Sequence, residues 1–211
     1  MRLHPDETEA GPWRRVCDDD LAALLARLLP DVRGVLLVDG RSGAGKSTVA
    51  ARIAALLDGA VVHSDDLAWH HDAFAWDDLA TTHVIEPWRR GECIDYTPPG
   101  WVAQGRDGSV TVPDGVRVLL LEGVGAGRAS LAEHADAVVW VQSDRDEARE
   151  RGLRRDVELG RTPVEAERFW DEWMAAEEPF LARDRPWERA DLVVCALESE
   201  WAPGRTTVAR G

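Results

Sequence analysis

One short segment constrains this chain more than any other feature. Residues 40–47 read GRSGAGKS and satisfy the pattern G-x-x-x-x-G-K-[ST] of phosphate-binding loops. Of the 25 lysine and arginine residues, only Lys46 in this segment is a lysine. A chain that uses arginine everywhere else has lysine at the one position where a compact point charge suits phosphate better than a planar guanidinium.

The surrounding sequence places this segment between a strand and a helix. Residues 34–39 are an apolar run typical of a buried parallel strand, and residues 47–57 carry apolar side chains at helical spacing. In such a turn, backbone N–H groups and the helix N-terminus point at one anion. We predict a nucleoside triphosphate site with Mg²⁺ on the serine hydroxyl. Its predicted contacts come from Gly40, Ser42, Gly43, Ala44, Gly45, Lys46, Ser47 and Thr48.

Size, composition and charge indicate a single compact enzyme domain. The chain has 211 residues, of which 45% are hydrophobic, which is enough for one substantial core. A net charge of −14 argues against a nucleic-acid partner and against an anionic membrane surface. The sequence shows no apolar run of membrane-spanning length and no evident signal peptide, and its three cysteines suggest neither disulfides nor a metal site. We expect a cytoplasmic protein and leave a homo-oligomer open.

Apolar strands alternate with helices along the chain, a pattern typical of a parallel α/β sheet. The predicted fold class is the three-layer sandwich of P-loop NTPases, with an arginine-bearing lid. The expected strands cover residues 34–39, 60–63, 116–121, 137–141 and 190–195, and the expected helices cover residues 18–29, 47–57, 144–159 and 163–181.

Carboxylates follow several of the predicted strands. Asp65 and Asp66 come after one apolar run, and Glu122 ends another. In parallel α/β sheets, ligands gather beyond the carboxyl ends of the strands. Phosphoryl transfer needs a metal ion and a base or positioner for the attacking hydroxyl, so either aspartate suits the base and Glu122 suits Mg²⁺. Carboxylates at strand ends are often only solvated loop residues, but the phosphate loop beside them favours the functional interpretation. The candidate metal ligands are Ser47, Glu122 and Asp65.

Arginines are concentrated in a polar helical segment in the second half of the chain. Arg145 and Arg149 alternate with acidic residues and suit ion pairs on a helix surface. Arg151, Arg155 and Arg161 suit a lid that closes over ATP and neutralises charge on the transferring phosphoryl group.

Several further segments carry motifs of a known family. They are VHSDDL at 62–67, HDAFAWD at 71–77, LEGV at 121–124, RDVELGR at 155–161, EPF at 178–180 and RADLVV at 189–194. With the phosphate loop they make residues 34–195 resemble the uridine kinase family of P-loop kinases, close kin of phosphoribulokinase. The resemblance implies a kinase that uses Mg-ATP, with Asp65 as catalytic base and Glu122 on Mg²⁺. It also implies that Lys46, Arg155 and Arg161 act on the phosphates.

Departures from the family pattern concern the acceptor more than the reaction. Leu67 and Ala68 stand where the family has an aromatic pair, and YTPPGW at 96–101 replaces a tyrosine-rich stretch. Aromatic faces in this region suit stacking on a nucleobase or a sugar-like ring, although tryptophan is also common in cores. Tryptophans of the helical tail are expected to pack: Trp170, Trp173 and Trp187. The candidate acceptor-binding residues are Asp66, Trp69, His71, Phe74, Trp76, Tyr96 and Trp101.

These observations predict a kinase that transfers the γ-phosphate of ATP to a small polar acceptor, with a nucleoside-like acceptor favoured. A phosphotransferase for a specialised metabolite or antibiotic and a non-catalytic ATP-binding module stay open as alternatives. A regulatory GTPase is excluded, because its N-K-x-D motif needs a second lysine. The predicted parts are an N-terminal arm and helix (1–33, with 1–17 loosely held), the kinase domain (34–195) with its less regular acceptor region (67–113) and lid (144–162), and a C-terminal tail (196–211).

Overall fold

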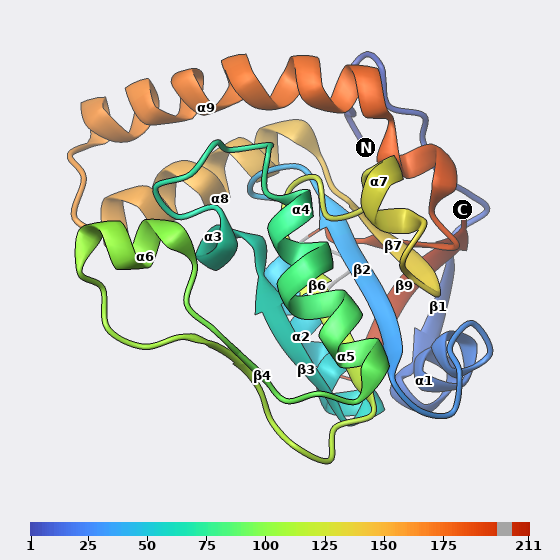
Figure 1. The fold of residues 1–211 in the computed structure, drawn as a ribbon. Coiled ribbons are helices and arrows are strands. Elements are labelled where there is room, and N and C mark those ends of the chain that lie inside the picture. The colour runs from blue at the N-terminus through green and yellow to red at the C-terminus, as the bar shows by residue number, and fades with distance from the viewer. Residues whose placement is uncertain (198–203) are drawn as a thin grey trace.

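A seven-stranded sheet forms the centre of the computed structural model, which describes residues 1–197 and 204–211 (Figure 1). The strands lie in the order β1-β9-β8-β7-β2-β6-β3. All neighbouring pairs between β8 and β3 are parallel, whereas β9 runs antiparallel to both β8 and β1. The strand bounds are β1 (Arg14–Cys17), β2 (Gly34–Gly40), β3 (Gly59–His63), β6 (Val118–Glu122), β7 (Ala137–Gln142), β8 (Leu192–Cys195) and β9 (Arg205–Arg210).

The strand before the phosphate loop lies in the middle of the sheet. Leu36 of β2 stands opposite Leu120 of β6 on one side and Ala137 of β7 on the other. Every residue of β2 is buried, as its continuous apolar sequence predicts for a strand covered on both faces. The loop therefore starts from a fully buried strand in the interior of the sheet.

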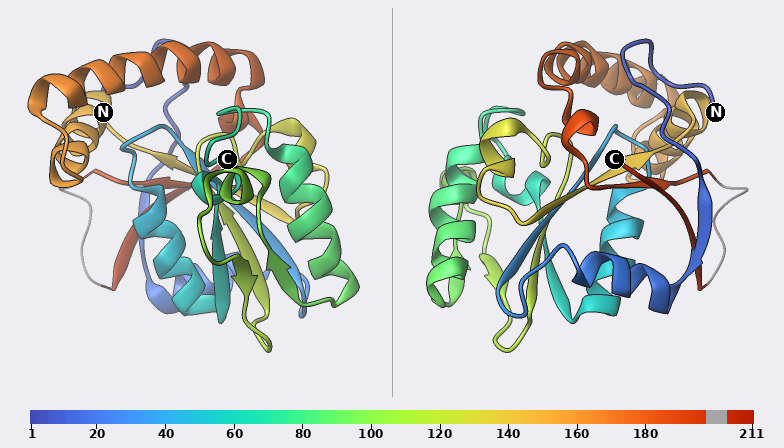
Figure 2. Two further views of the ribbon diagram at one scale, coloured as in Figure 1. Left: turned by 60° about the vertical axis from the view of Figure 1, so that its left-hand side comes forward. Right: turned by 90° about the vertical axis from the view of Figure 1, so that its right-hand side faces the viewer.

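Helices cover both faces of the sheet, so the molecule has three layers (Figure 2). Leu36 and Val38 pack in a core cluster with α1 (Asp18–Ala26) and α2 (Lys46–Leu57). Val35 and Leu37 face the other way and join the cluster of α4 (Asp77–Ala80), η1 (Thr81–Ile85) and α5 (Glu86–Arg90). This alternation along β2 is the strand period of two, and it confirms the predicted α/β sandwich.

Two long helices lie together beyond one end of the sheet, with α9 across the top of the molecule in Figure 1. α8 (Arg145–Glu158) begins at Asp144, whose carboxylate accepts the amides of residues 146 and 147. α9 (Pro163–Asp184) begins with a capping box between Thr162 and Glu165. No helix in the described ranges combines the length and the apolar character needed to cross a membrane.

The N-terminal segment differs from the loosely held arm expected over residues 1–17, and that expectation was wrong. Residues 14–17 form β1, which pairs with β9. Further upstream, Glu7 is buried and the backbone amide of Ala10 donates to the Gln142 side chain. These partners lie more than a hundred residues away in sequence, so no local pattern could indicate them.

The region expected to be less regular, residues 67–113, is largely ordered into elements. α4, η1 and α5 form one continuous helical segment with a π turn in its middle. The strands β4 (Ile94–Tyr96) and β5 (Val110–Val112) pair as a small antiparallel sheet. The remaining short helices are α3 (Ser64–Leu67), α6 (Pro99–Gln104), α7 (Ala129–Ala132) and the 3₁₀ turn η2 (Pro186–Arg189).

α8 and α9 pack so closely at Gly152 that there is no space for a side chain. A Cβ at this position would lie 2.0 Å from an indole carbon of Trp170 on α9. Alanine gains about 1 kcal/mol of helix propensity over glycine, but forcing the indole away costs about 1–3 kcal/mol. We expect Gly152→Ala to lower the free energy of unfolding in urea, whereas Glu150→Ala on the exposed face of α8 leaves it within about 0.5 kcal/mol. A more stable Gly152→Ala variant would contradict the packing.

Candidate active site

A cavity of about 680 Å³ opens beside the phosphate loop, at the carboxyl ends of β3 and β6. Its lining joins the end of the loop to the start of α3, to the lid side of α8 and to the aromatic face of α9. Ten of the predicted site residues line it: Ser42, Lys46, Ser47, Asp65, Trp69, His71, Trp76, Glu122, Arg155 and Arg161.

The phosphate loop presents the bare N-terminus of α2. Gly45 takes the N-cap position with φ of 97°, and no described side chain caps the first amides of the helix. Lys46 is buried, and its ammonium donates to the backbone carbonyl of Arg41 at 3.1 Å. An uncapped helix start beside a buried ammonium suits an incoming phosphate. The side chains of Ala44, buried in the core, and Thr48, exposed, do not line the cavity.

Gly43 is required for a reason that the sequence did not reveal. Its φ is 73°, and a Cβ there would lie 2.0 Å from the backbone carbonyl oxygen of Ala148 on α8. The loop thus packs directly against α8 at this point. Arg151 strengthens the same contact, because its guanidinium donates to the carbonyls of Gly43 and Ala196 and to the Ser143 hydroxyl. The structure therefore places Arg151 against the loop and outside the cavity lining.

Two of the candidate metal ligands lie side by side. The Ser47 hydroxyl donates to Glu122 Oε2 at 3.2 Å, because β2 and β6 are parallel neighbours. A hydroxyl and a carboxylate oxygen are the ligand types that Mg²⁺ prefers, so this pair fits the metal. His63 also contacts Glu122 Oε2, through Nδ1 at 2.6 Å.

The charges around Glu122 set its ionisation. Burial alone would raise its pKa, but the hydrogen bond with His63 and the charge of Lys46 outweigh burial and hold the pKa below its usual value. Conversely, the hydrogen bond to Glu122 raises the pKa of His63. Glu122 therefore stays a carboxylate at neutral pH, as a metal ligand must.

The structure separates Asp65 from Asp66. Asp65 lies in the first turn of α3, is exposed and lines the cavity. The Asp66 carboxylate accepts from Arg106 at 3.0 Å, and its carbonyl accepts from the Trp101 indole at 2.8 Å. Of the two, only Asp65 lines the cavity where a hydroxyl acceptor would lie.

Arg155, near the end of α8, and Arg161, between α8 and α9, line the cavity. Both contact Asp156 Oδ1, at 3.2 and 3.8 Å. The Asp156 carboxylate is buried, and its second oxygen has no hydrogen-bond partner in the described structure. The arginines are thus held near each other by one acidic side chain while part of each stays exposed.

The predicted acceptor-binding aromatics divide into two groups. Trp69 and Trp76 line the cavity. Trp101, Phe74 and Tyr96 lie outside the lining. Trp101 is buried, the ring of Phe74 stacks on that of Phe180 with 4.4 Å between the ring centroids, and Tyr96 stacks on His83.

The cavity has an aromatic wall, formed by Trp69, Trp76, Phe169, Trp170 and Trp173, and sequence reasoning missed part of it. Trp170 and Trp173 of α9, which were expected only to pack, line the cavity together with Phe169. Their helical spacing looks like that of any amphipathic helix, so only the position of α9 over the sheet reveals the role. Trp187 is buried in the core, as expected.

Asp39 is the second residue whose role differs from the one its sequence position suggests: at the end of a strand it was expected to be able to meet the metal-nucleotide, but the structure encloses it among backbone amides. It is fully buried at the end of β2 and accepts the backbone amides of Gly40, Gly125 and Gly127. It ties the start of the phosphate loop to the loop after β6. Burial is the main cause that raises its pKa to about 6, and the three amides and Lys46 oppose that rise.

Comparisons with known proteins agree with this geometry. No family model and no curated protein matches the sequence. Solved structures do match, among them a candidate fructose transport system kinase from Silicibacter sp. TM1040, 16% identical with a TM-score of 0.56 over 72% of this chain and 86% of that one. A candidate uridine kinase from Bacillus stearothermophilus is 20% identical with a TM-score of 0.55 over 83% and 96% of the two chains. The YGR205w protein is 12% identical with a TM-score of 0.53 over 92% and 96%.

The chain has a P-loop kinase fold. At these identities the likeness shows the fold alone. It confirms the predicted fold class and the resemblance to this group of folds. The roles of the individual site residues stay predictions, and so do the domain limits.

The buried Asp39 gives a pH signature. Its folded pKa of about 6 lies above the usual 3.8, so the native state binds more protons than the unfolded state between these values. The resulting stability is present at low pH and is lost as the pH rises through 6. Asp39→Asn also turns an amide N–H₂ toward the amide of Gly127, which costs about 1–3 kcal/mol.

We therefore expect the stability of the wild type relative to Asp39→Asn to increase by about 1 kcal/mol or more when the pH is lowered from 7.5 to 5. Urea unfolding at both pH values measures it. A constant difference would contradict the raised pKa of Asp39, and Asp107→Asn in an exposed loop serves as the matched control.

Proposed function

We propose that this protein is a kinase that transfers the γ-phosphate of Mg-ATP to a hydroxyl of a small polar molecule. One observation carries the proposal: the Ser47–Glu122 pair and Asp65 open into the same cavity beside Lys46. A phosphate-binding end and a carboxylate facing open space are what phosphoryl transfer to a second substrate requires. A module that only binds nucleotide has no need of the second feature.

The phosphate end of the cavity would hold the donor. The amides at the start of α2 and the Lys46 ammonium would bind the β- and γ-phosphates. Ser47 and Glu122 would hold Mg²⁺, which supplies charge neutralisation at the transferring phosphoryl group when it is bound. Arg155 and Arg161 would add positive charge from the lid side.

Asp65 would act on the acceptor. In the proposed step the acceptor hydroxyl oxygen forms a bond to the γ-phosphorus while the bond between that phosphorus and the β–γ bridging oxygen breaks. The hydroxyl proton passes to the Asp65 carboxylate, and the products are ADP and a phosphate monoester. Asp65 is exposed within the cavity, so it is free to meet a hydroxyl.

The aromatic wall supports a nucleoside-like acceptor. The half-buried side chains of Trp69 and Trp173 line the cavity, and their flat apolar faces suit a nucleobase or another ring. A net charge of −14 favours a small molecule over a nucleic-acid partner. An antibiotic or another specialised metabolite with a ring and a free hydroxyl would fit the same wall.

The first test is a phosphorylation screen with Mg-ATP and a panel of nucleosides, vitamins, sugars and aminoglycosides, followed by mass spectrometry. We expect a gain of one phosphate on one class of compound and a rate at least 10²-fold lower for Asp65→Asn, because the hydroxyl loses its base. Asp107→Asn, an exposed aspartate outside the cavity, is the control and keeps the wild-type rate. Equal rates in Asp65→Asn and the wild type would remove Asp65 from the mechanism, and tight ATP binding without any product would favour a binding module.

The metal site has its own test. Glu122→Gln keeps an oxygen for the Ser47 hydroxyl but removes the negative charge. We expect the Mg²⁺ concentration that half-saturates ATP binding to rise about tenfold or more, as measured by calorimetry across a Mg²⁺ titration. Glu133→Gln, on an exposed residue, is the matched control. An unchanged Mg²⁺ dependence would show that Glu122 does not serve the metal.

A further inference from the structure

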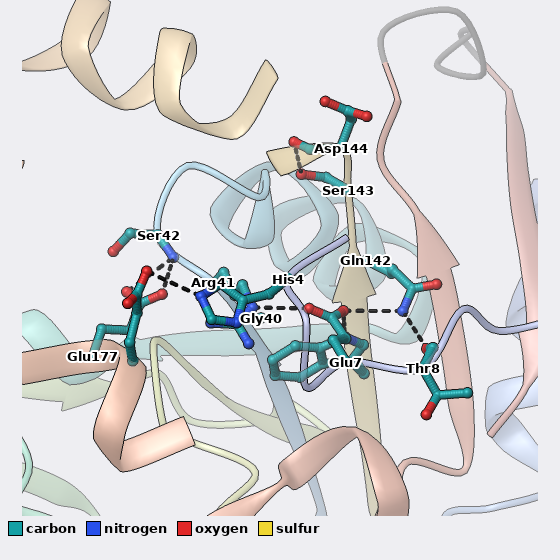
Figure 3. A network of polar contacts seen from close by, with 12 residues as sticks. His4, Glu7, Thr8, Gly40, Arg41, Ser42, Gln142, Ser143, Asp144 and Glu177 are labelled. Atoms are coloured by element: carbon teal, nitrogen blue, oxygen red, sulfur yellow. Dashed lines mark hydrogen bonds and ion pairs between the residues drawn. The ribbon is translucent and has the colours of Figure 1, made fainter. Parts of the chain in front are cut away.

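The N-terminal segment reaches the phosphate loop from its outer side. Figure 3 shows Glu7 between Arg41 of the loop and Gln142 at the end of β7. Glu7 and Arg41 line a separate cavity of about 280 Å³, distinct from the one that contains Lys46. A residue upstream of the first strand thus touches the second residue of the loop.

The Glu7 carboxylate is fixed on one side by the sheet. Oε1 accepts from the indole N–H of Trp140 at 2.8 Å and from the side-chain amide of Gln142 at 3.0 Å. Both donors lie on β7, and both are buried. These two neutral bonds hold Oε1 and leave Oε2 for a third partner.

That third partner is Arg41. Its Nε donates to Glu7 Oε2 at 2.8 Å, and the two side chains are 14% and 3% exposed. A charge-assisted bond between groups this buried is stronger than a surface ion pair, because little water competes for either group. The Arg41 side chain therefore has one favoured position while Glu7 is in place.

The backbone of Arg41 carries this constraint into the nucleotide site. Its carbonyl accepts the amide of Ala44 at 3.0 Å and the Lys46 ammonium at 3.1 Å. The next amide, that of Ser42, donates to both oxygens of Glu177, a fully buried carboxylate on α9. The first half of the loop is thus held by two carboxylates from outside, while its second half stays free for phosphate.

The geometry points to Glu7 as a positioning residue for nucleotide binding, acting through Arg41 on the phosphate loop. Glu7 itself touches no phosphate. It fixes the turn whose carbonyl orients Lys46, so the loop has its binding shape before the ligand arrives, and less ordering remains to oppose binding. This inference rests on the proposed function only in requiring that the loop binds a nucleotide.

The test is the affinity for Mg-ADP, measured by calorimetry on Glu7→Gln. The glutamine carbonyl still accepts from Trp140 and Gln142, but its N–H₂ now faces Arg41 Nε, donor against donor. We expect the Kd for Mg-ADP to rise about tenfold, which corresponds to the loss of one charge-assisted bond. Circular dichroism at the working temperature confirms that the protein compared is folded.

A purely structural role would leave the affinity of the folded protein unchanged, so the affinity is the decisive readout. Glu9→Gln is the matched control: the same change on an exposed residue of the same segment leaves the Kd unchanged. A cycle with Arg41→Gln isolates the coupling, because Glu7→Gln has no further effect on the Kd once the arginine is gone. If Glu7→Gln does not fold, Arg41→Gln alone is measured, and the same tenfold rise is expected.

Three results would overturn the inference. They are an unchanged Kd in folded Glu7→Gln, an unchanged Kd in Arg41→Gln, and a tenfold rise that persists in the Arg41→Gln background. If the wild type binds Mg-ADP and the variants bind it with the same Kd, this inference is contradicted but the proposed function is not. A wild type that does not bind Mg-ADP would contradict the proposed function as well.

Discussion

A helix N-terminus that is to receive phosphate must keep its backbone N–H groups away from protein acceptors, so other contacts must hold the turn in shape. In this protein buried carboxylates do so. Asp39, at the end of β2, accepts three glycine amides. Glu7 accepts from the Arg41 side chain, and Glu177 accepts from the backbone amide of Ser42. Burying these groups costs free energy, and the donors at each carboxylate oxygen reduce that cost. The shape of the loop therefore depends on the adjacent Asp39 and on two carboxylates, Glu7 and Glu177, that are distant in sequence.

The carboxylates around the cavity form a second set with a different environment. Asp65 is exposed, and Glu122 keeps a depressed pKa through His63 and Lys46 although it is buried. Asp39 has the opposite shift, since its donors do not fully offset burial. One residue type thus serves as scaffold where it is enclosed by amides, and as a candidate ligand or base where it opens into the cavity.

Features that depend on residues close together in sequence could be predicted from the sequence, whereas features that depend on distant partners could not. The central strands, α2 and the meeting of Ser47 with Glu122 follow from apolar runs and from the geometry of parallel sheets, so the sequence indicates them. The roles of Asp39 and Glu7 depend on partners far along the chain, and no spacing rule links Glu7 to Trp140. Trp170 and Trp173 carry the periodicity of a packing face, and only the placement of α9 turns that face toward the cavity. The acceptor region was expected to be irregular because its sequence is rich in Trp, His, Pro and Gly. The structure instead forms a helical segment there that contains a π turn.

The pairing of β1 with β9 has a consequence for the order of folding. Arg14 stands opposite Val208, so this edge of the sheet closes across nearly the whole described sequence. Contacts between residues so far apart in sequence form late, because closing the long loop costs chain entropy before the strand pairing contributes any stabilisation. The central strands and α2 can assemble earlier from nearer neighbours. The segment that carries Glu7 precedes β1 directly, so the phosphate loop is expected to reach its final rigidity among the last steps of folding.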